Sequence, residues 1–277
     1  MPPLLGSGTR FIAASLLLGT IVLLVKGPRA FTVTASQIRG AMFMGVTILG
    51  VAIGIVTLAV RYVPTGIAAL IASVLPLWII LFRLRAGDRP SRLTLIGVGV
   101  GLIGLFLILI PGGTVPISGA SNTQVALWSV AIACGSFCWA FFSWRSTSYQ
   151  QPKNPLTTAV IQLASAGVFL TLVGVLIGET WNFGIFTQQS WAGWAFLVFA
   201  SSAAYGAYVW LINNAPMSLV TTHAYVNPMV AVTLGFLILK ESISLDVVVG
   251  LSIVVGGVAL VVNGERRTRQ LLVEPPQ

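Results

Sequence analysis

Residues 39–60 read RGAMFMGVTILGVAIGIVTLAV, and the one charged residue in this stretch is Arg39 at its start. A helix that crosses the hydrocarbon core of a bilayer needs about 20 mostly apolar residues. The stretch therefore predicts a transmembrane helix. The next residues, RYVPT at 61–65, hold a charge and a proline, which predict a tight turn before another apolar run.

The same pattern of apolar run and short polar break extends over the whole chain. Of its 277 residues 56% are hydrophobic and only 8% are charged, and the mean hydropathy is +0.96, whereas soluble domains carry about 25% charged residues. This composition excludes a soluble protein, and the length leaves no room for a large soluble module. We predict an all-α membrane protein. Its nine visible transmembrane helices are expected at 4–25, 39–60, 64–82, 93–110, 125–145, 155–178, 191–212, 216–239 and 245–263.

The formal net charge of +9 does not predict a nucleic-acid partner, because the basic residues lie in short loops and not on one folded face. We interpret the charge as a signal for the orientation of the chain in the membrane. Lys and Arg in short loops mark the cytoplasmic side of a membrane. Sorting alternate loops puts twelve of the 15 basic residues on one side, and Arg61 and Lys240 on the other. We expect the C-terminus in the cytoplasm and, with nine helices, the N-terminus as written outside.

An internal repeat appears when the chain is compared with itself at an offset of 152 residues. Pro64 then matches Pro216 and Pro76 matches Pro228, and a one-residue slip matches Gly97 with Gly250 and Gly104 with Gly257. The second copy holds five predicted helices, an odd number, so the copies would have opposite orientations in the membrane. Inverted repeats are typical of secondary transporters that work by alternating access. The alternative is a duplicated structural bundle without transport.

The first copy contains four predicted helices against five in the second. Shifting 125–145 back by 152 residues places the partner helix before Met1. We therefore expect that the first helix of repeat one is missing, through truncation, a wrong start or real loss. The expected organisation is a first repeat at 1–113, a second repeat at 125–264 and a cytoplasmic tail at 265–277.

Several segments resemble the drug/metabolite transporter superfamily, specifically its EamA-type ten-helix exporters and their YedA-like branch. The resemblance covers nearly the whole chain. It is carried by VPTGIAALIASVLPLW (63–78), IGVGVGLIGLFLI (96–108), WAFFSWRS (139–146) and HAYVNPMVAVTLGFLILKESIS (223–244). The resemblance implies two inverted five-helix repeats in the inner membrane and outward transport of amino acids, related metabolites or drugs.

Candidate substrate-binding residues are polar side chains within the predicted spans, because such groups are costly when they face lipid. Arg10 lies inside the first span and could contact an anion or carboxylate, or anchor the helix end. His223, the only histidine, shares a helix face with Asn227 and could couple protons or simply be a hydrogen-bonded packing residue. Pro76 and Pro228 would kink their helices and serve as hinges.

Aromatic side chains supply the remaining candidates. Trp78, Trp139 and Tyr205 could line an amphipathic pocket, and the resemblance places their helices at the family's central cavity. The alternative for aromatic residues is core packing or an interface belt, which suits Trp181 and Trp191 better.

Motifs for other functions are missing from the sequence. There is no ATP-binding loop, no metal-ligand cluster and no carboxylate deep in a predicted span, and Cys134 and Cys138 are expected to be packing residues. We therefore predict no enzyme activity and no cofactor, with a small-molecule substrate and the lipid bilayer as partners and a monomer or homodimer as the assembly. The alternatives are an assembly partner, a lipid-modifying enzyme, a channel or a transport-incompetent truncated form.

Overall fold

The computed structural model describes residues 1–63, 68, 71–72, 74–88, 90–109, 121–223, 226, 230 and 245–273. Within these residues the secondary structure is helical and no strand occurs. The helices are α1 (Pro3–Lys26), α2 (Ala35–Gly45), α3 (Ala52–Ala59), α5 (Leu75–Arg85), α6 (Arg92–Leu109), α7 (Asn122–Arg145), α8 (Pro155–Leu176), α9 (Gln188–Asn214), α10 (Met217–Val220) and α12 (Leu245–Val273).

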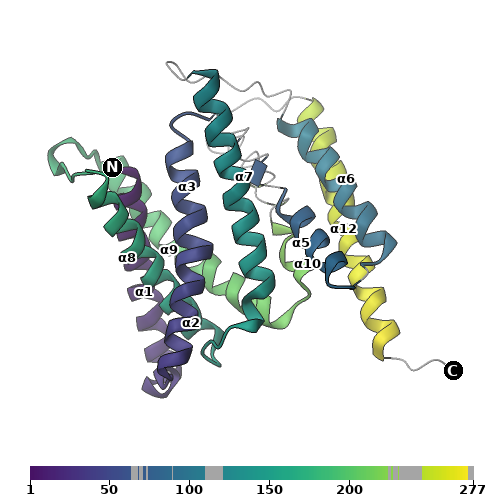
Figure 1. Cartoon of the computed structure of the whole chain (residues 1–277), viewed down its shortest axis with the longest axis horizontal. Helices are drawn as coiled ribbons and strands as arrows, with labels where there is room; N and C mark the ends of the chain where they lie inside the picture. The colour runs from purple at the N-terminus through teal and green to yellow at the C-terminus, as the bar shows by residue number, and fades with distance from the viewer. Residues whose placement is uncertain are drawn as a thin grey trace. The chain divides into compact units, whose positions relative to one another are not determined.

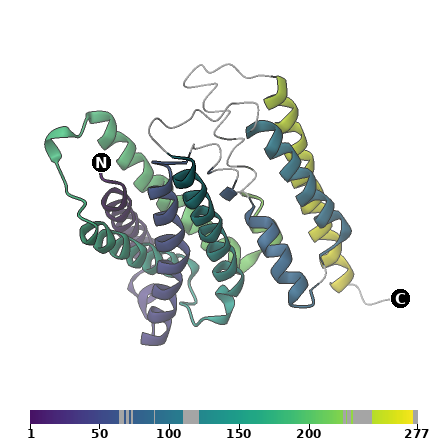
Figure 2. The same ribbon diagram turned by 45° about the horizontal axis from the view of Figure 1, so that its top comes forward.

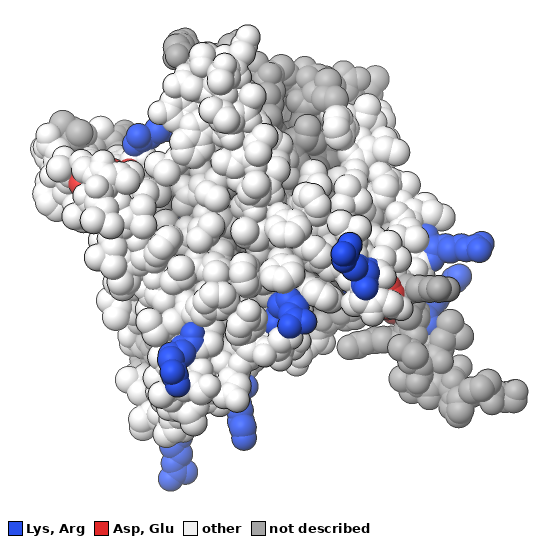
Figure 3. Space-filling model, in the orientation of Figure 1, with Lys and Arg blue, Asp and Glu red and all other residues white. Residues whose placement is uncertain are grey.

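Six helical segments in the described part of the chain are long and apolar enough to cross a membrane. They are Pro3–Lys26, Ala35–Ala59, Asn122–Ser148, Pro155–Leu176, Gln188–Asn214 and Val248–Arg267. Most of the visible surface is accordingly uncharged, with basic side chains in small groups (Figure 3). These segments confirm the predicted class, an all-helical membrane protein. Parts of the predicted span 64–82 and most of the predicted span 216–239 lie outside the described residues.

The chain divides into two compact units, each of which takes segments from both halves of the sequence. Unit 1 consists of Met1–Leu58 and Phe142–Asn214, and unit 2 of Ala59–Phe141 and Ala215–Gln277. Unit 1 holds α1, α2, α8 and α9, and unit 2 holds α5, α6, α10 and α12 (Figure 1).

In unit 1, α1 packs along α8 through small residues. A Cβ atom added to Gly8 would come within 2.8 Å of the Gly167 carbonyl oxygen. Farther along, the Ser15 hydroxyl donates to the Val160 carbonyl over 2.9 Å. From the first contact to the second, the residue number rises on α1 and falls on α8, so the two helices are antiparallel. Glycine and serine permit this close approach, as small residues do between membrane helices.

Helix ends in unit 1 are set by capping groups that an apolar pattern does not report. Thr34 and Gln37 form a capping box, so the second helical segment begins at Ala35, before the predicted start at residue 39. The two carboxylate oxygens of Glu179 accept hydrogen bonds from the amides of Leu4 (3.2 Å) and Leu5 (2.8 Å) at the start of α1. These are amides that no helical carbonyl can satisfy.

The predicted helix 39–60 is interrupted by a π-helical segment, Val46–Val51, between α2 and α3. Gly45, just before it, lies against the backbone of Gln162 and the side chain of Ser165 on α8. A Cβ atom on Gly50 would come within 2.7 Å of the Phe169 ring. The wider helical turn thus occurs where the chain is pressed closely onto α8.

In unit 2, α6 and α12 lie side by side (Figure 2). A Cβ atom on Gly97 would come within 2.7 Å of the Gly257 carbonyl oxygen, and one on Gly104 within 2.8 Å of the Gly250 carbonyl oxygen. The helices are therefore antiparallel, and all four glycines lie at the contact. The α12 helix also continues to Val273, beyond the predicted end at residue 263, because no glycine or proline interrupts 265–273.

Candidate functional site

A chain of buried polar side chains connects α9 with α8 in unit 1. The Tyr205 hydroxyl donates to Gln162 Oε1 over 2.7 Å, and Gln162 Nε2 donates to Gln151 Oε1 over 2.8 Å. Gln151 Nε2 donates in turn to the Ser146 carbonyl over 2.7 Å. The hydroxyl of the predicted site residue Tyr205 thus has an acceptor within unit 1.

A second buried tyrosine extends this polar region of unit 1. Tyr208 stacks on Tyr205 with ring centroids 5.8 Å apart. Its hydroxyl and that of Ser143 are 2.7 Å apart, and either can be the donor. A buried hydroxyl without a partner would be destabilising, and here both tyrosines are paired.

Arg10 has a different environment, also in unit 1. Its Nε atom is buried and has no hydrogen-bond partner among the described residues. The guanidinium carbon lies 4.5 Å from the centroid of the Phe11 ring, a cation–π contact. Arg10 is thus a cation inside a span, and its buried Nε donates no hydrogen bond to the described residues.

Unit 2 contains an aromatic cluster that includes the predicted site residue Trp78. Trp78 on α5 packs edge to face on Phe137 of α7, with 5.3 Å between the ring centroids. Phe82 packs on the same Phe137 ring with a centroid distance of 5.4 Å. Trp139, also on α7, is half-buried. These contacts place Trp78 in a cluster of aromatic rings on α5 and α7.

The other predicted residues are only partly described. His223 Nδ1 lies 2.8 Å from the Val220 carbonyl, to which it donates, a local bond that fits the packing alternative. Pro76 is buried in the first turn of α5, where a missing N–H breaks no helical hydrogen bond. Asn227 and Pro228 lie outside the described residues.

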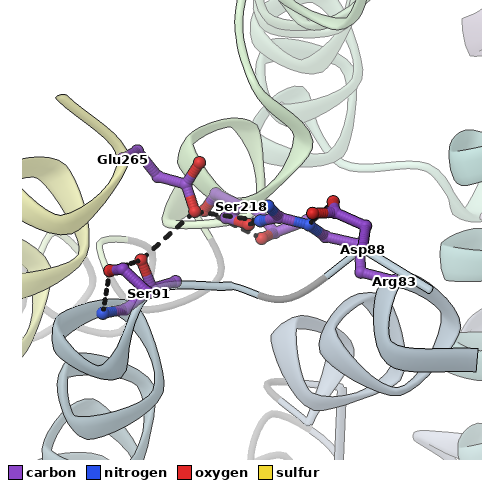
Figure 4. A network of polar contacts seen from close by, with 7 residues as sticks. Arg83, Asp88, Ser91, Ser218 and Glu265 are labelled. Atoms are coloured by element: carbon purple, nitrogen blue, oxygen red, sulfur yellow. Dashed lines mark hydrogen bonds and ion pairs between the residues drawn. The ribbon is translucent and has the colours of Figure 1, made fainter. Parts of the chain in front are cut away.

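Sequence reasoning missed a polar network in unit 2 that joins α5, α10, α6 and α12 (Figure 4). Arg83 donates to Asp88 Oδ2 over 2.7 Å, to Glu265 Oε1 over 2.9 Å and to the Ser218 hydroxyl. Thr94 on α6 donates to the same Glu265 oxygen over 3.2 Å. The network joins side chains of four helices through the Arg83 guanidinium and the Glu265 carboxylate.

The electrostatics of this network favour the charged form of Arg83. Burial lowers its pKa, but the hydrogen bonds and negative charges of Asp88 and Glu265 outweigh burial and raise the pKa above its ordinary value. Glu265 was expected in a tail, and the structure instead places it in α12 with a nearly buried side chain. Its charge is tolerated there because Arg83 neutralises it. No local signal in the sequence connects residues this far apart.

Groups that would support other chemistry do not converge in the described residues. No cluster of three or more His, Cys, Asp or Glu side chains that could hold a metal ion occurs there. Cys134 and Cys138 on α7 are free thiols.

These features define a membrane protein that crosses the bilayer several times. Its helices are apolar and of spanning length, they cross closely at glycines, and they carry buried polar side chains within the spans. The EamA-like transporter family matches residues 1–110 and 126–263, and the chain belongs to this family, whose members transport solutes across membranes. As the resemblance implied, the chain is therefore a membrane transporter.

Known relatives agree with this assignment. The chain is 33% identical over 267 residues to the uncharacterized inner membrane transporter YedA of Escherichia coli K12, covering 95% of this chain and 83% of the relative. The proteins of the same name from strains O157:H7 and O6:H1 match equally. A crystal structure described only as that of a protein superposes with a TM-score of 0.78 at 18% identity, covering 97% of this chain and 90% of that one. At this identity the structure supports the fold alone.

Proposed function

We propose that the chain is a secondary transporter that exports small amphipathic metabolites such as amino acids, related metabolites or drugs by alternating access. Membership of a transporter family and the similarity to an inner membrane transporter support the proposal. Neither the sequence nor the described residues supply an ATP-binding loop, which favours a secondary mechanism.

The observation that carries the proposal is a symmetry in the helix crossings. The repeat offset exchanges Gly97 with Gly250 and Gly104 with Gly257. Applied to the contact of Gly97 with Gly257, it produces the second contact, Gly104 with Gly250. Two contacts that exchange under the repeat are what a two-fold axis between antiparallel copies would produce, which supports inverted repeats at 1–113 and 125–264.

The crossing of α1 with α8 has the same property. An offset of 152 turns the contact of Gly8 with Gly167 into one between Val160 and Ser15. The structure has a hydrogen bond between these two residues. Two repeat-related helices that cross at the two-fold axis of the repeat can rotate about that axis with little change in their packing. Alternating access requires such a motion.

For the substrate site we propose contacts from aromatic and polar side chains in the spans and hinges at two prolines. The proposed binding residues are Trp78, Trp139, Tyr205, His223, Asn227 and Arg10, and the proposed hinges are Pro76 and Pro228. The aromatic cluster around Trp78 and the half-buried position of Trp139 support an amphipathic site.

The test is solute export from cells or vesicles that contain the chain. We expect faster loss of labelled amino acids or a dye than in vesicles without the protein, with saturation at high solute concentration. Trp139→Ala with Asn227→Ala should abolish the difference. Phe196→Ala on the exposed face of α9 is the matched control and should export normally. Flux that survives in the double variant contradicts the site, and flux that never saturates indicates a channel.

A further inference from the structure

We infer that the transported solute carries one carboxylate and that Arg10 binds it. This inference rests on the proposed function and adds the chemical class of the substrate. Its basis is the position of Arg10 inside α1, the buried Nε donor and the engagement of the described carboxylates elsewhere.

Arg10 lies in the interior of a spanning helix. It is seven residues past Pro3, the first residue of α1, which corresponds to about 10 Å along the helix axis at 1.5 Å per residue. Charged side chains within spans normally face protein or water and pair with one another or with backbone carbonyls. Arg10 Nε is buried yet meets no acceptor among the described residues. The nearby Phe11 ring offers a cation–π contact but no hydrogen-bond acceptor.

The acidic side chains that the structure describes are each engaged elsewhere. Asp88 and Glu265 pair with Arg83 in unit 2. Glu179 accepts from the amides of Leu4 and Leu5 at the start of α1. None of these three forms an ion pair with Arg10. An acceptor for the guanidinium is therefore best supplied by a ligand.

The geometry of the guanidinium favours a carboxylate. Nε–H and one Nη–H point the same way and form a fork that matches the two oxygens of a carboxylate. A carboxylate on this fork would satisfy the buried Nε donor, which has no acceptor in the described part of the chain.

The charge of the spans favours a carboxylate group over a phosphate ester group as the partner of Arg10. Arg10 is the one Lys or Arg away from the ends of the six candidate spans. A carboxylate brings one negative charge and neutralises Arg10. A phosphate monoester carries nearly two charges at neutral pH and would leave an uncompensated charge in the membrane, which is costly.

The first experiment compares acids with amines. The purified chain is reconstituted in phosphatidylcholine vesicles loaded with a mixture of labelled L-amino acids, or with the amines obtained by removing their carboxylates. We expect the wild type to export amino acids and not amines, Arg10→Gln to reduce export at least tenfold, and Arg10→Lys to give an intermediate rate. The exposed Arg39→Gln is the matched control and should match the wild type.

The outcomes separate the two proposals. Equal export of amines, or wild-type export by Arg10→Gln, overturns the inference and leaves the proposed function standing. Export of neither mixture by the wild type contradicts the proposed function, and the inference falls with it.

A second measurement distinguishes a substrate from a lipid headgroup and needs no flux. Thermal unfolding is followed in a phosphate-free sugar detergent, with the amino-acid mixture or with phosphatidylglycerol added. The amino acids should raise the midpoint for the wild type and for Arg39→Gln, but not for Arg10→Gln. An increase that depends on Arg10 and occurs with phosphatidylglycerol alone would assign the guanidinium to lipid and overturn the inference. Arg10→Lys gives the same comparison if the glutamine variant does not fold.

Discussion

Arg83 and Glu265 form a close, nearly buried ion pair. Their side chains are only 11% and 7% exposed, with 2.9 Å between Nη1 and Oε1. Removing one partner of such a pair leaves the other charge buried and uncompensated, which typically costs about 3–5 kcal/mol. Each residue therefore depends on the other, although the pair as a whole need not add stability over an apolar pair.

We predict that Arg83→Gln lowers the free energy of unfolding by about 3 kcal/mol, because Glu265 loses its counter-charge. Arg85→Gln, an exposed residue in the same turn, should change it little. Chemical denaturation in detergent measures the difference. Adding Glu265→Gln to Arg83→Gln should recover much of the loss, and equal stability of the two single variants would contradict the prediction.

The pH dependence of this pair follows from the raised pKa of Arg83. A cation whose pKa is raised on folding contributes fully at every pH below its unfolded value, and the contribution is lost only above it. The ordinary pKa of an arginine side chain already lies far above neutral pH. The destabilisation by Arg83→Gln should therefore stay constant between about pH 6 and pH 9 in the same denaturation experiment.

The sequence predicted where charges lie but not which of them meet. The apolar pattern identified Arg10 as a cation inside a span, and Glu265 was expected in the tail. The contact between Arg83 and Glu265 depends on how α5 and α12 pack, so no local pattern reports it. The hydrogen bond of Tyr205 to Gln162 was missed for the same reason.

At the scale of helices, the repeat pointed to glycines that bring α6 and α12 together. On α6, Gly97 lies against α12, whereas a Cβ atom on Gly99 would meet nothing within 4 Å. The two glycines are in one helix and differ only in the face they occupy. Their comparison separates helix contact from the intrinsic preference of glycine, which disfavours helices equally at both positions.

We predict that Gly97→Ala destabilises the protein by about 1–3 kcal/mol, because the new methyl group would overlap the Gly257 carbonyl. Gly99→Ala should be neutral or slightly stabilising, since alanine favours a helix and space is open there. Thermal unfolding of the purified variants measures both. Equal midpoints for the two variants would show that the close crossing does not contribute to stability.

Helix existence was easier to predict from the sequence than helix ends. Long apolar runs identified α1, α7, α8 and α9, because burial in lipid requires them. The start of α2 was missed because the Thr34–Gln37 capping box is polar. The π-helical segment Val46–Val51 was missed because it arises from contact with α8, which is not encoded in the local pattern.

At the scale of the whole molecule, α8 makes a direct test of orientation possible. It has 22 residues, which span about 33 Å at 1.5 Å per residue, enough to cross the hydrocarbon core. The segments at its two ends must then lie on opposite sides of the membrane. The excess of Lys and Arg predicts that the segment before α8, at 146–154, is cytoplasmic and that the segment after it, at 178–190 and including the first turn of α9, is external.

We predict that a membrane-impermeant maleimide added to intact cells labels Gln189→Cys but not Ser148→Cys, in a background of Cys134→Ser and Cys138→Ser. Both positions are exposed and neither substitution changes a charge, so the basic residues that set the orientation stay in place. Ser148→Cys should react only after the cells are permeabilised. Labelling of Ser148→Cys alone in intact cells would mean that the chain is inserted the other way round, and labelling of both would mean that α8 does not cross the membrane.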